Sequence, residues 1–249
     1  MEIEELNKKT CKPIPVMGKI STIFECVVVE GKSNKEGRDI KFLATSKLYN
    51  NFDNALKNNL RYLVSGKVDG TCCLIMNGKF MKRRDIKEGR KVPDDWIETS
   101  PVDKKGHRIG FIPVQLIGKD DKWFKDALVI TETEVMIKVF GFDNGTTIIK
   151  TVPIKDLEGQ TVEFVGPKVQ GDPHKIGVHC VIPHGIFKLD GFPQDFNFDK
   201  FVKWFSEDKK TQFFEGIVVH FENGQLFKIH RHHMDLEWKP KNSFLGVTF

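Results

Sequence analysis

The sequence predicts an α+β fold in which antiparallel sheets dominate and helices are few. Several short segments rich in β-branched and aromatic residues are bounded by Gly, Asn, Asp or Pro, which is typical of strands. Two Asn-Gly pairs, Asn77-Gly78 and Asn223-Gly224, separate such segments and predict hairpin turns between antiparallel neighbours. Strands and helices do not alternate regularly along the chain, so a parallel βαβ sheet is not expected.

The individual elements follow from the spacing of the apolar residues. Two segments have helical spacing, Ser46–Leu60 and Asp199–Ser206, and the second has Asn197 or Asp199 as a candidate N-cap. The charged stretch Lys82–Gly110 has little periodicity and is predicted to be a long connection. The predicted strands are Arg61–Gly66, Thr71–Met76, Phe111–Ile117, Val135–Phe142, Thr161–Val165, Val178–Ile182, Phe213–Phe221 and Gln225–His230.

The chain shows no internal repeat and no low-complexity linker. We therefore predict a single domain over residues 1–249, with residues 1–60 free of recognisable motifs and residues 61–235 as the motif-bearing core. There is no apolar run of about 18 residues and the first residues are acidic and polar, so we expect no membrane span, no signal peptide and an intracellular location.

Charge and cysteine content narrow the function classes only a little. The net charge of +5 suits a polyanionic partner, and it equally suits a solvated basic face. The five cysteines are irregularly spaced and form no CxxC pair, so neither a disulfide framework nor a cysteine zinc site is expected.

A lysine stands inside Gly66-Lys67-Val68-Asp69-Gly70, directly after a predicted strand. Lysine becomes a covalent nucleophile when its ammonium group loses a proton, which partial burial or a nearby metal ion favours. The glycines let the backbone approach a bulky ligand. A pattern this short also fits a surface turn, so the other motifs must decide between the two interpretations.

The second predicted hairpin carries three more polar residues of interest. Glu215 precedes its first strand, and Lys228 and His230 lie two residues apart in its second strand. Alternation in a strand places Lys228 and His230 on one face and the apolar residues on the other. Glu215 is a candidate metal ligand, directly or through water, and Lys228 is a candidate phosphate ligand.

Two further segments contribute charge. Glu163 lies on an apolar strand that ends in Gly-Pro, within Thr161–Lys168. Lys82-Arg83-Arg84 follows the first hairpin and either places cations over a phosphate or forms a solvated basic cluster.

In chain order, the segments KVDG, KRR, EFVG, EGIVV and FKIH resemble motifs I, Ia, III, IV and V of the covalent nucleotidyltransferases. This superfamily contains ATP-dependent DNA and RNA ligases and mRNA capping enzymes. The phrases GPKVQGDPH, VIPHG and HRHH resemble a narrower branch, the small 5′-to-3′ RNA ligases that include a vertebrate cytosolic enzyme. The resemblance implies an ATP-grasp-like adenylation domain of antiparallel sheets flanked by helices, with no OB domain.

The resemblance also implies a reaction. Lys67 would attack the α-phosphate of ATP and carry AMP as lysyl-AMP; AMP would pass to an RNA 5′-phosphate, and the RNA 3′-hydroxyl would displace it. Asp69 would organise the nucleophile loop, and Glu215 would position Mg²⁺ or Mn²⁺, with Glu163 as a second metal candidate. The residues implied in nucleotide or phosphate contacts are Lys67, Arg83 or Arg84, Glu163 at the ribose, His184 or Phe187 at the adenine, Lys228 at the α-phosphate, and His230. No membrane or protein partner is implied.

The sequence departs from the family pattern at two positions. Many ligases have a second lysine where this chain has His230, and a histidine makes phosphate contact depend on pH. Many relatives have Glu immediately before the nucleophile, where this chain has Gly66.

The histidines and Trp96 leave several interpretations open. His230, His232 and His233 form either a zinc site that lacks a fourth ligand, a contact to RNA phosphate, or an exposed cluster, and we favour the last two. The histidines at positions 174, 179 and 184 either line the nucleotide pocket or are structural. Trp96 either stacks on a base or, as we favour, fixes a loop to the core.

Two rival functions remain at this stage. An mRNA guanylyltransferase is disfavoured because the 21 residues after Lys228 are too few for an OB barrel, leaving Lys8, Lys9, Lys12 and Lys19 as candidate substrate contacts. A non-catalytic RNA-end or nucleotide-binding module is disfavoured because the candidate nucleophile and acids are all present.

Overall fold

A computed structural model describes residues 11–31, 39–103, 106–117, 119, 121–238, 240 and 242–248. The chain forms two compact units. Unit 1 comprises Met1–Ile14, Ile20–Val68 and Phe187–Pro240, and unit 2 comprises Pro15–Lys19, Asp69–Ile186 and Lys241–Phe249. That the two units make up a single domain stays a prediction. Lys8 and Lys9 lie outside the described residues. None of the helices within these ranges is both long and apolar enough to cross a membrane.

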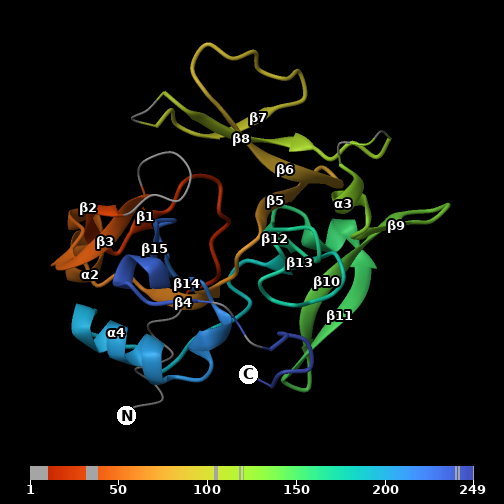
Figure 1. Ribbon diagram of the computed structural model, residues 1–249. Helices are drawn as coiled ribbons and strands as arrows, with labels where there is room; N and C mark the ends of the chain where they lie inside the picture. Colours follow the sequence, from red (N-terminus) through yellow and green to blue (C-terminus); the bar gives the residue numbers. More distant parts are fainter. Residues whose placement is uncertain are drawn as a thin grey trace. The chain divides into compact units, whose positions relative to one another are not determined.

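Unit 1 is built on a four-stranded sheet in the order β1-β15-β14-β4 (Figure 1). The second Asn-Gly pair forms the turn of the β14–β15 hairpin, as predicted, and β4 pairs antiparallel with β14. The short β1 is parallel to β15. The strands are β1 (Ser21–Thr22), β4 (Tyr62–Lys67), β14 (Gly216–Phe221) and β15 (Leu226–His230), with a separate hairpin of β2 (Phe24–Gly31) and β3 (Asp39–Leu48).

Aromatic packing of two helices stabilises unit 1. The helices are α2 (Asn50–Lys57) and α4 (Phe198–Glu207). The Asn197 side chain accepts a hydrogen bond from Lys200 N, which confirms it as the N-cap of α4. The buried Phe52 ring of α2 meets the rings of Phe196, Phe221 and Phe227 edge to face. Phe201 of α4 stacks on Phe196, and both arrangements are favoured for aromatic pairs.

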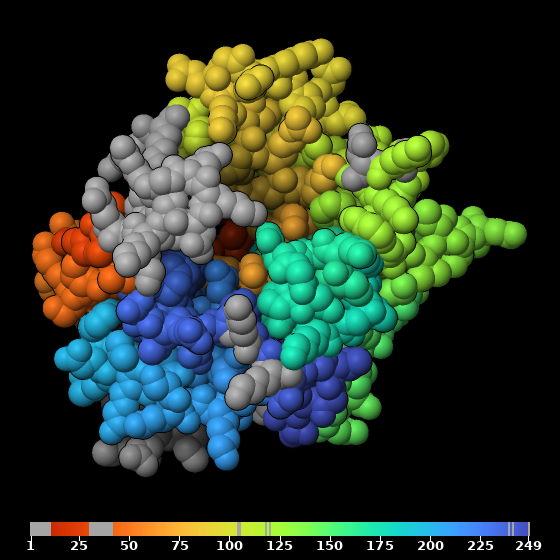
Figure 2. Space-filling view, viewed as in Figure 1, coloured from red at the N-terminus to blue at the C-terminus, as the bar shows by residue number. Residues whose placement is uncertain are grey.

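Unit 2 is a nine-stranded sheet in the order β11-β10-β13-β12-β5-β6-β8-β7, with β9 paired to β10. Asn77 and Gly78 have φ values of 53° and 66°, and the β5–β6 hairpin forms at this turn as predicted. The strands are β5 (Thr71–Met76), β6 (Lys79–Ile86), β7 (Ile97–Ser100), β8 (Arg108–Pro113), β9 (Leu128–Ile130), β10 (Val135–Asp143), β11 (Thr146–Pro153), β12 (Thr161–Val165) and β13 (Cys180–Pro183). In Figure 2 the dark blue C-terminal segment lies against the green strands, where Thr147 N donates to Val247 O.

The mostly antiparallel, helix-poor architecture agrees with the predicted α+β class. The prediction of a long connection over 82–110 was wrong, because β6, β7 and the start of β8 occupy much of it. Many side chains of these strands are charged and face solvent, so the sequence shows no clear alternation of apolar and polar residues. Trp96 packs with Ile86 and Ile112 and donates from Nε1 to Arg84 O, so the core interpretation of this residue is confirmed. The predicted helix at 46–60 is shorter than expected because its first residues belong to β3.

Candidate active site

Lys67 and Glu215 form an ion pair at one end of the unit 1 sheet. Lys67 is the last residue of β4, and Glu215 immediately precedes β14, the strand paired with it. The Glu215 backbone N–H donates to Lys67 O at 3.0 Å. The Nζ of Lys67 lies 2.6 Å from Oε2 of Glu215, with the side chains 21% and 18% exposed. The strand pairing thus places the candidate nucleophile and the candidate metal ligand in direct contact.

Strand register puts three basic side chains on one face of the same sheet. Gly216 pairs with Lys67 on one side and with His230 on the other. Residues directly opposite in antiparallel strands share a face, so Lys67 and His230 lie on the same face, and Lys228 joins them two residues earlier on β15. An added Cβ at Gly216 would overlap the Ile229 carbonyl, so the position requires glycine. The predicted facing of Lys228 and His230 is confirmed, since Phe227 and Ile229 are buried on the other face.

The Phe214 ring leaves no room for a side chain at Gly66, the residue before the candidate nucleophile Lys67. An added Cβ at Gly66 would overlap the Phe214 ring, which is fully buried. The ring of Phe187 packs against Phe214 at a centroid distance of 5.1 Å, and its carbonyl accepts from Gly66 N. Phe187 is 2% exposed, so the adenine contact implied for it stays a prediction.

Gly66→Ala is expected to destabilise the protein by about 1–3 kcal/mol, the usual cost of overpacking a core, because the new methyl group meets an aromatic ring held on all sides. Urea unfolding gives the free energy. The control introduces Gly66→Ala into a Phe214→Leu variant, where the loss in free energy of unfolding caused by the added methyl group should be smaller. Equal penalties in both backgrounds would show that the Phe214 ring is not the cause.

His230 is buried beside the ion pair. Its Nδ1 lies 3.2 Å from Oε1 of Glu215. Burial, helped by the charges of Lys67 and Lys228, holds the pKa of this imidazole far below its usual range. His230 is therefore neutral near pH 7 in this state, and the pH-dependent phosphate contact considered for it is not favoured.

In unit 2, a chain of hydrogen bonds leads to Glu163. Val16 N donates to Thr161 Oγ1 at 2.7 Å, and the same oxygen lies 2.9 Å from His184 Nδ1. Because a carboxylate oxygen accepts, His184 donates from Nε2 to Oε2 of Glu163 at 2.8 Å. Both nitrogens of His184 are thus engaged in orienting Glu163, and contact of its ring with adenine stays a prediction.

Asp69 is held by a histidine whose role the sequence left open. Its backbone N–H donates to His174 Nε2 at 2.9 Å, and the His174 ring stacks on Phe244. An added Cβ at Gly70 would overlap the Phe164 carbonyl, which accounts for the glycine of KVDG. The structural interpretation of His174 is favoured, since it holds the backbone of Asp69, two residues after Lys67.

The basic segment of β6 divides between two faces. Arg83 donates to both carboxylate oxygens of Asp85, and Arg84 points to the opposite face and is exposed. Lys82 pairs with the buried Asp121, whose other oxygen accepts from Gln115 N. A single ligand on one face therefore meets Arg83 or Arg84, not both. No local pattern points to Asp121 as the partner of Lys82, because the two residues lie 39 positions apart.

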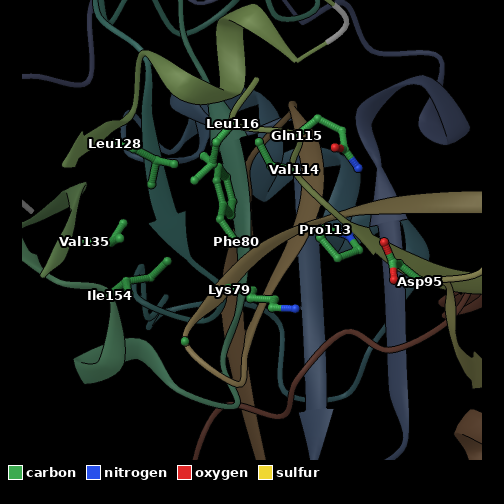
Figure 3. Close-up of a pocket in the computed structure, with 11 residues that line it drawn as sticks. Lys79, Phe80, Asp95, Pro113, Val114, Gln115, Leu116, Leu128, Val135 and Ile154 are labelled. Carbon is green, nitrogen blue, oxygen red and sulfur yellow. The ribbon is translucent and has the colours of Figure 1, made fainter. Parts of the chain in front are cut away.

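A separate pocket of about 270 Å³ lies in unit 2 (Figure 3). It is mostly apolar, with the side chains of Leu128, Val135 and Ile154 along one side and Pro113 along another. None of the candidate catalytic residues lines it. It is therefore not part of the candidate active site.

Comparison with known proteins identifies the family. The family model for RNA ligase 1 matches residues 81–248. RNA ligase 1 of Danio rerio is 30% identical over 73% of this chain and 70% of its own length. The proteins of the same name from Pongo abelii and Mus musculus are each 27% identical over 92% of this chain, and over 86% and 85% of their own lengths. The chain belongs to the RNA ligase 1 family.

Proposed function

We propose that this protein is an ATP-dependent RNA ligase that joins 5′-phosphate and 3′-hydroxyl ends through lysyl-AMP on Lys67 and an adenylylated RNA 5′ end. The observation that carries the proposal is the half-buried pair of Lys67 and Glu215 on a sheet face shared with Lys228. Family membership supports RNA ligation, since the relatives are named RNA ligase 1.

The first step requires Lys67 to lose a proton. While its ammonium pairs with Glu215, the lone pair needed for attack on the α-phosphate is occupied. Mg²⁺ or Mn²⁺ suits an all-oxygen donor set, and when held by Glu215 it would supply positive charge beside the phosphates. Lys67 would then be released from its partner, and its amine would attack as pyrophosphate leaves.

The other basic residues, Lys228 and Arg83 or Arg84, would contact phosphate groups. Lys228 lies on the same face as Lys67 and would stabilise charge that develops on the α-phosphate oxygens. AMP would next move to the RNA 5′-phosphate, and attack by the 3′-hydroxyl would release AMP and form the phosphodiester. Arg83 or Arg84 would contact the phosphate of the RNA end. In-line transfers of this kind depend mainly on positioning and electrostatics.

Glu163 would bind the ribose hydroxyls, and His184 would set its orientation. One carboxylate oxygen is occupied by His184, which leaves the other to accept from the ribose. This arrangement fits ribose recognition better than metal binding for Glu163, because a histidine N–H already holds one oxygen of the carboxylate.

His184→Phe is expected to weaken ATP binding about ten-fold or more, since a hydrogen bond to a charged group contributes about 1.5–3 kcal/mol. Calorimetric titration of ATP without metal measures binding alone. His107→Phe is the matched control, because this histidine lies in the same unit beside Asp103 rather than Glu163. Unchanged affinity in His184→Phe would contradict an orienting role.

The proposal is tested by incubating protein freed of bound AMP with α-³²P-labelled ATP and Mg²⁺, followed by denaturing gel and peptide mapping. We expect an acid-labile label on the peptide that contains Lys67, and joining of a 5′-phosphorylated but not a 5′-hydroxyl RNA. Label from GTP alone would instead indicate a guanylyltransferase. Absence of label from both nucleotides would indicate a binding module.

A further inference from the structure

Three histidines gather on one short turn directly after β15. The turn is the 3₁₀ helix η3 (Arg231–Met234), with His230 as its N-cap residue. Side chains three residues apart eclipse in a 3₁₀ helix, so His230 and His233 share one side. Their rings stack at 4.9 Å with an interplanar angle of 6°, and His232 meets both edge-on at 4.8 and 4.3 Å. One ring nitrogen from each histidine lies within 4.8 Å of the others.

Arg231 holds this turn rigidly. Its side chain is buried and donates to Phe214 O at 3.2 Å, to Phe205 O at 2.8 Å and to Thr211 Oγ1 at 3.0 Å. The guanidinium also lies 5.1 Å from the centre of the Phe205 ring. The Arg231 guanidinium thus donates its hydrogen bonds to core residues and fixes the backbone of the turn that carries the three imidazoles. A set of metal ligands needs such a rigid support.

The hydrogen bonding of His230 is incomplete. The residue is only 8% exposed, and neither of its ring nitrogens makes a hydrogen bond of normal geometry within the described residues. The His233 backbone N–H approaches the His230 ring only in the looser arrangement of a capping box. Nδ1 lies near Oε1 of Glu215, the arrangement in which a carboxylate orients a metal-binding histidine and leaves Nε2 to bind. His233 Nδ1 accepts only a long hydrogen bond, 3.4 Å from His230 N, and this weak bond breaks at little cost. A buried imidazole whose nitrogens are not held by the protein is able to bind a metal ion that the neighbouring imidazoles also reach.

We infer that His230, His232 and His233 bind one divalent transition-metal ion of the Zn²⁺ class, with Glu215 orienting His230. Imidazole nitrogen selects such ions over Mg²⁺, which prefers oxygen. Tetrahedral bonds of about 2.0–2.1 Å place ligand atoms roughly 3.3 Å apart, so the rings must tilt toward one another from their present spacing. Three protein ligands leave a fourth position for water or a substrate oxygen. The ion would bind imidazole nitrogens, whereas Mg²⁺ is proposed at the carboxylate of Glu215, which here only orients His230. Binding of the ion does not depend on ligase activity.

The test uses untagged full-length protein, stripped with chelator and free of ATP and RNA. Co²⁺ is the probe, because its visible absorption reports nitrogen coordination directly, and Zn²⁺ affinity is obtained by competition. We expect one Co²⁺ per chain, displaced by Zn²⁺ but not by millimolar Mg²⁺. His232→Ala should weaken binding by about 100-fold or more, exceeding the 10- to 100-fold effect typical of an orienting partner. The exposed position of His232 keeps the fold intact, which circular dichroism verifies.

The control is His107→Ala, a histidine of unit 2 outside the cluster, which should bind Co²⁺ as the wild type does. Glu215→Gln should retain the absorption with reduced affinity, which separates this site from the proposed Mg²⁺ position. Absence of Co²⁺ absorption in the wild type, or equal affinity in His232→Ala, would overturn the inference. Neither result bears on the proposed ligase activity, because no nucleotide is present.

Discussion

Lys67→Arg is expected to reduce covalent adenylylation below detection, a loss of at least about 1,000-fold, while leaving the protein folded. Arginine keeps the positive charge that pairs with Glu215, so the sheet end keeps its ion pair. Its guanidinium stays protonated under all usable conditions and offers no free nitrogen lone pair for attack on phosphorus. The change therefore removes nucleophilicity with little loss of electrostatic stability. The label from α-³²P-ATP on a denaturing gel measures the effect.

The matched control is Lys57→Arg. Lys57 lies in the same unit and also pairs with a carboxylate, its Nζ being 2.6 Å from Oδ2 of Asp53. It is exposed on α2 and should label as the wild type does. Persistence of an acid-labile label in Lys67→Arg would place the nucleophile elsewhere and refute the role given to Lys67.

Local sequence signals were sufficient to predict the strands nearest the site. β5 and β12 have the predicted bounds, and the β14–β15 hairpin formed at its Asn-Gly turn. These strands are almost entirely apolar and end at strong turn residues, so their hydrophobic pattern was sufficient to predict where they begin and end. β2, β3 and β11 were missed, because exposed strands mix polar and apolar residues without a clear period.

The candidate site was predictable only where it follows from strand register. Lys67, Lys228 and Glu215 were predicted from motifs, and the register of β4, β14 and β15 places Lys67 beside Glu215 and on the same sheet face as Lys228. The contacts that support them were not predictable. Examples are the packing of the Phe214 ring against Gly66 and the hydrogen bond from Arg231 to Phe205 O. These contacts join residues far apart in the sequence, so no local pattern predicts them.

Glu215→Gln is expected to slow adenylylation on the order of 100- to 1,000-fold, the range for loss of one preorganised electrostatic group. The amide has the shape of the carboxylate but not its charge, so it neither pairs ionically with Lys67 nor holds a divalent cation firmly. Single-turnover labelling with ATP measures the rate. Glu222→Gln is the control, because Glu222 adjoins the other end of β14, where it pairs with Arg61 at the surface.

A second substrate separates the two roles of Glu215. RNA already adenylylated at its 5′ end needs no attack by Lys67, so joining of this RNA depends on the carboxylate only through the metal. If Glu215 positions the cation in every step, Glu215→Gln should slow joining of this RNA by a factor similar to that for labelling. If Glu215 acts only by holding Lys67, joining should match the wild type while labelling stays slow. Because Lys67 and Glu215 share one hydrogen bond, only this comparison assigns the cation to the carboxylate rather than to its neighbours.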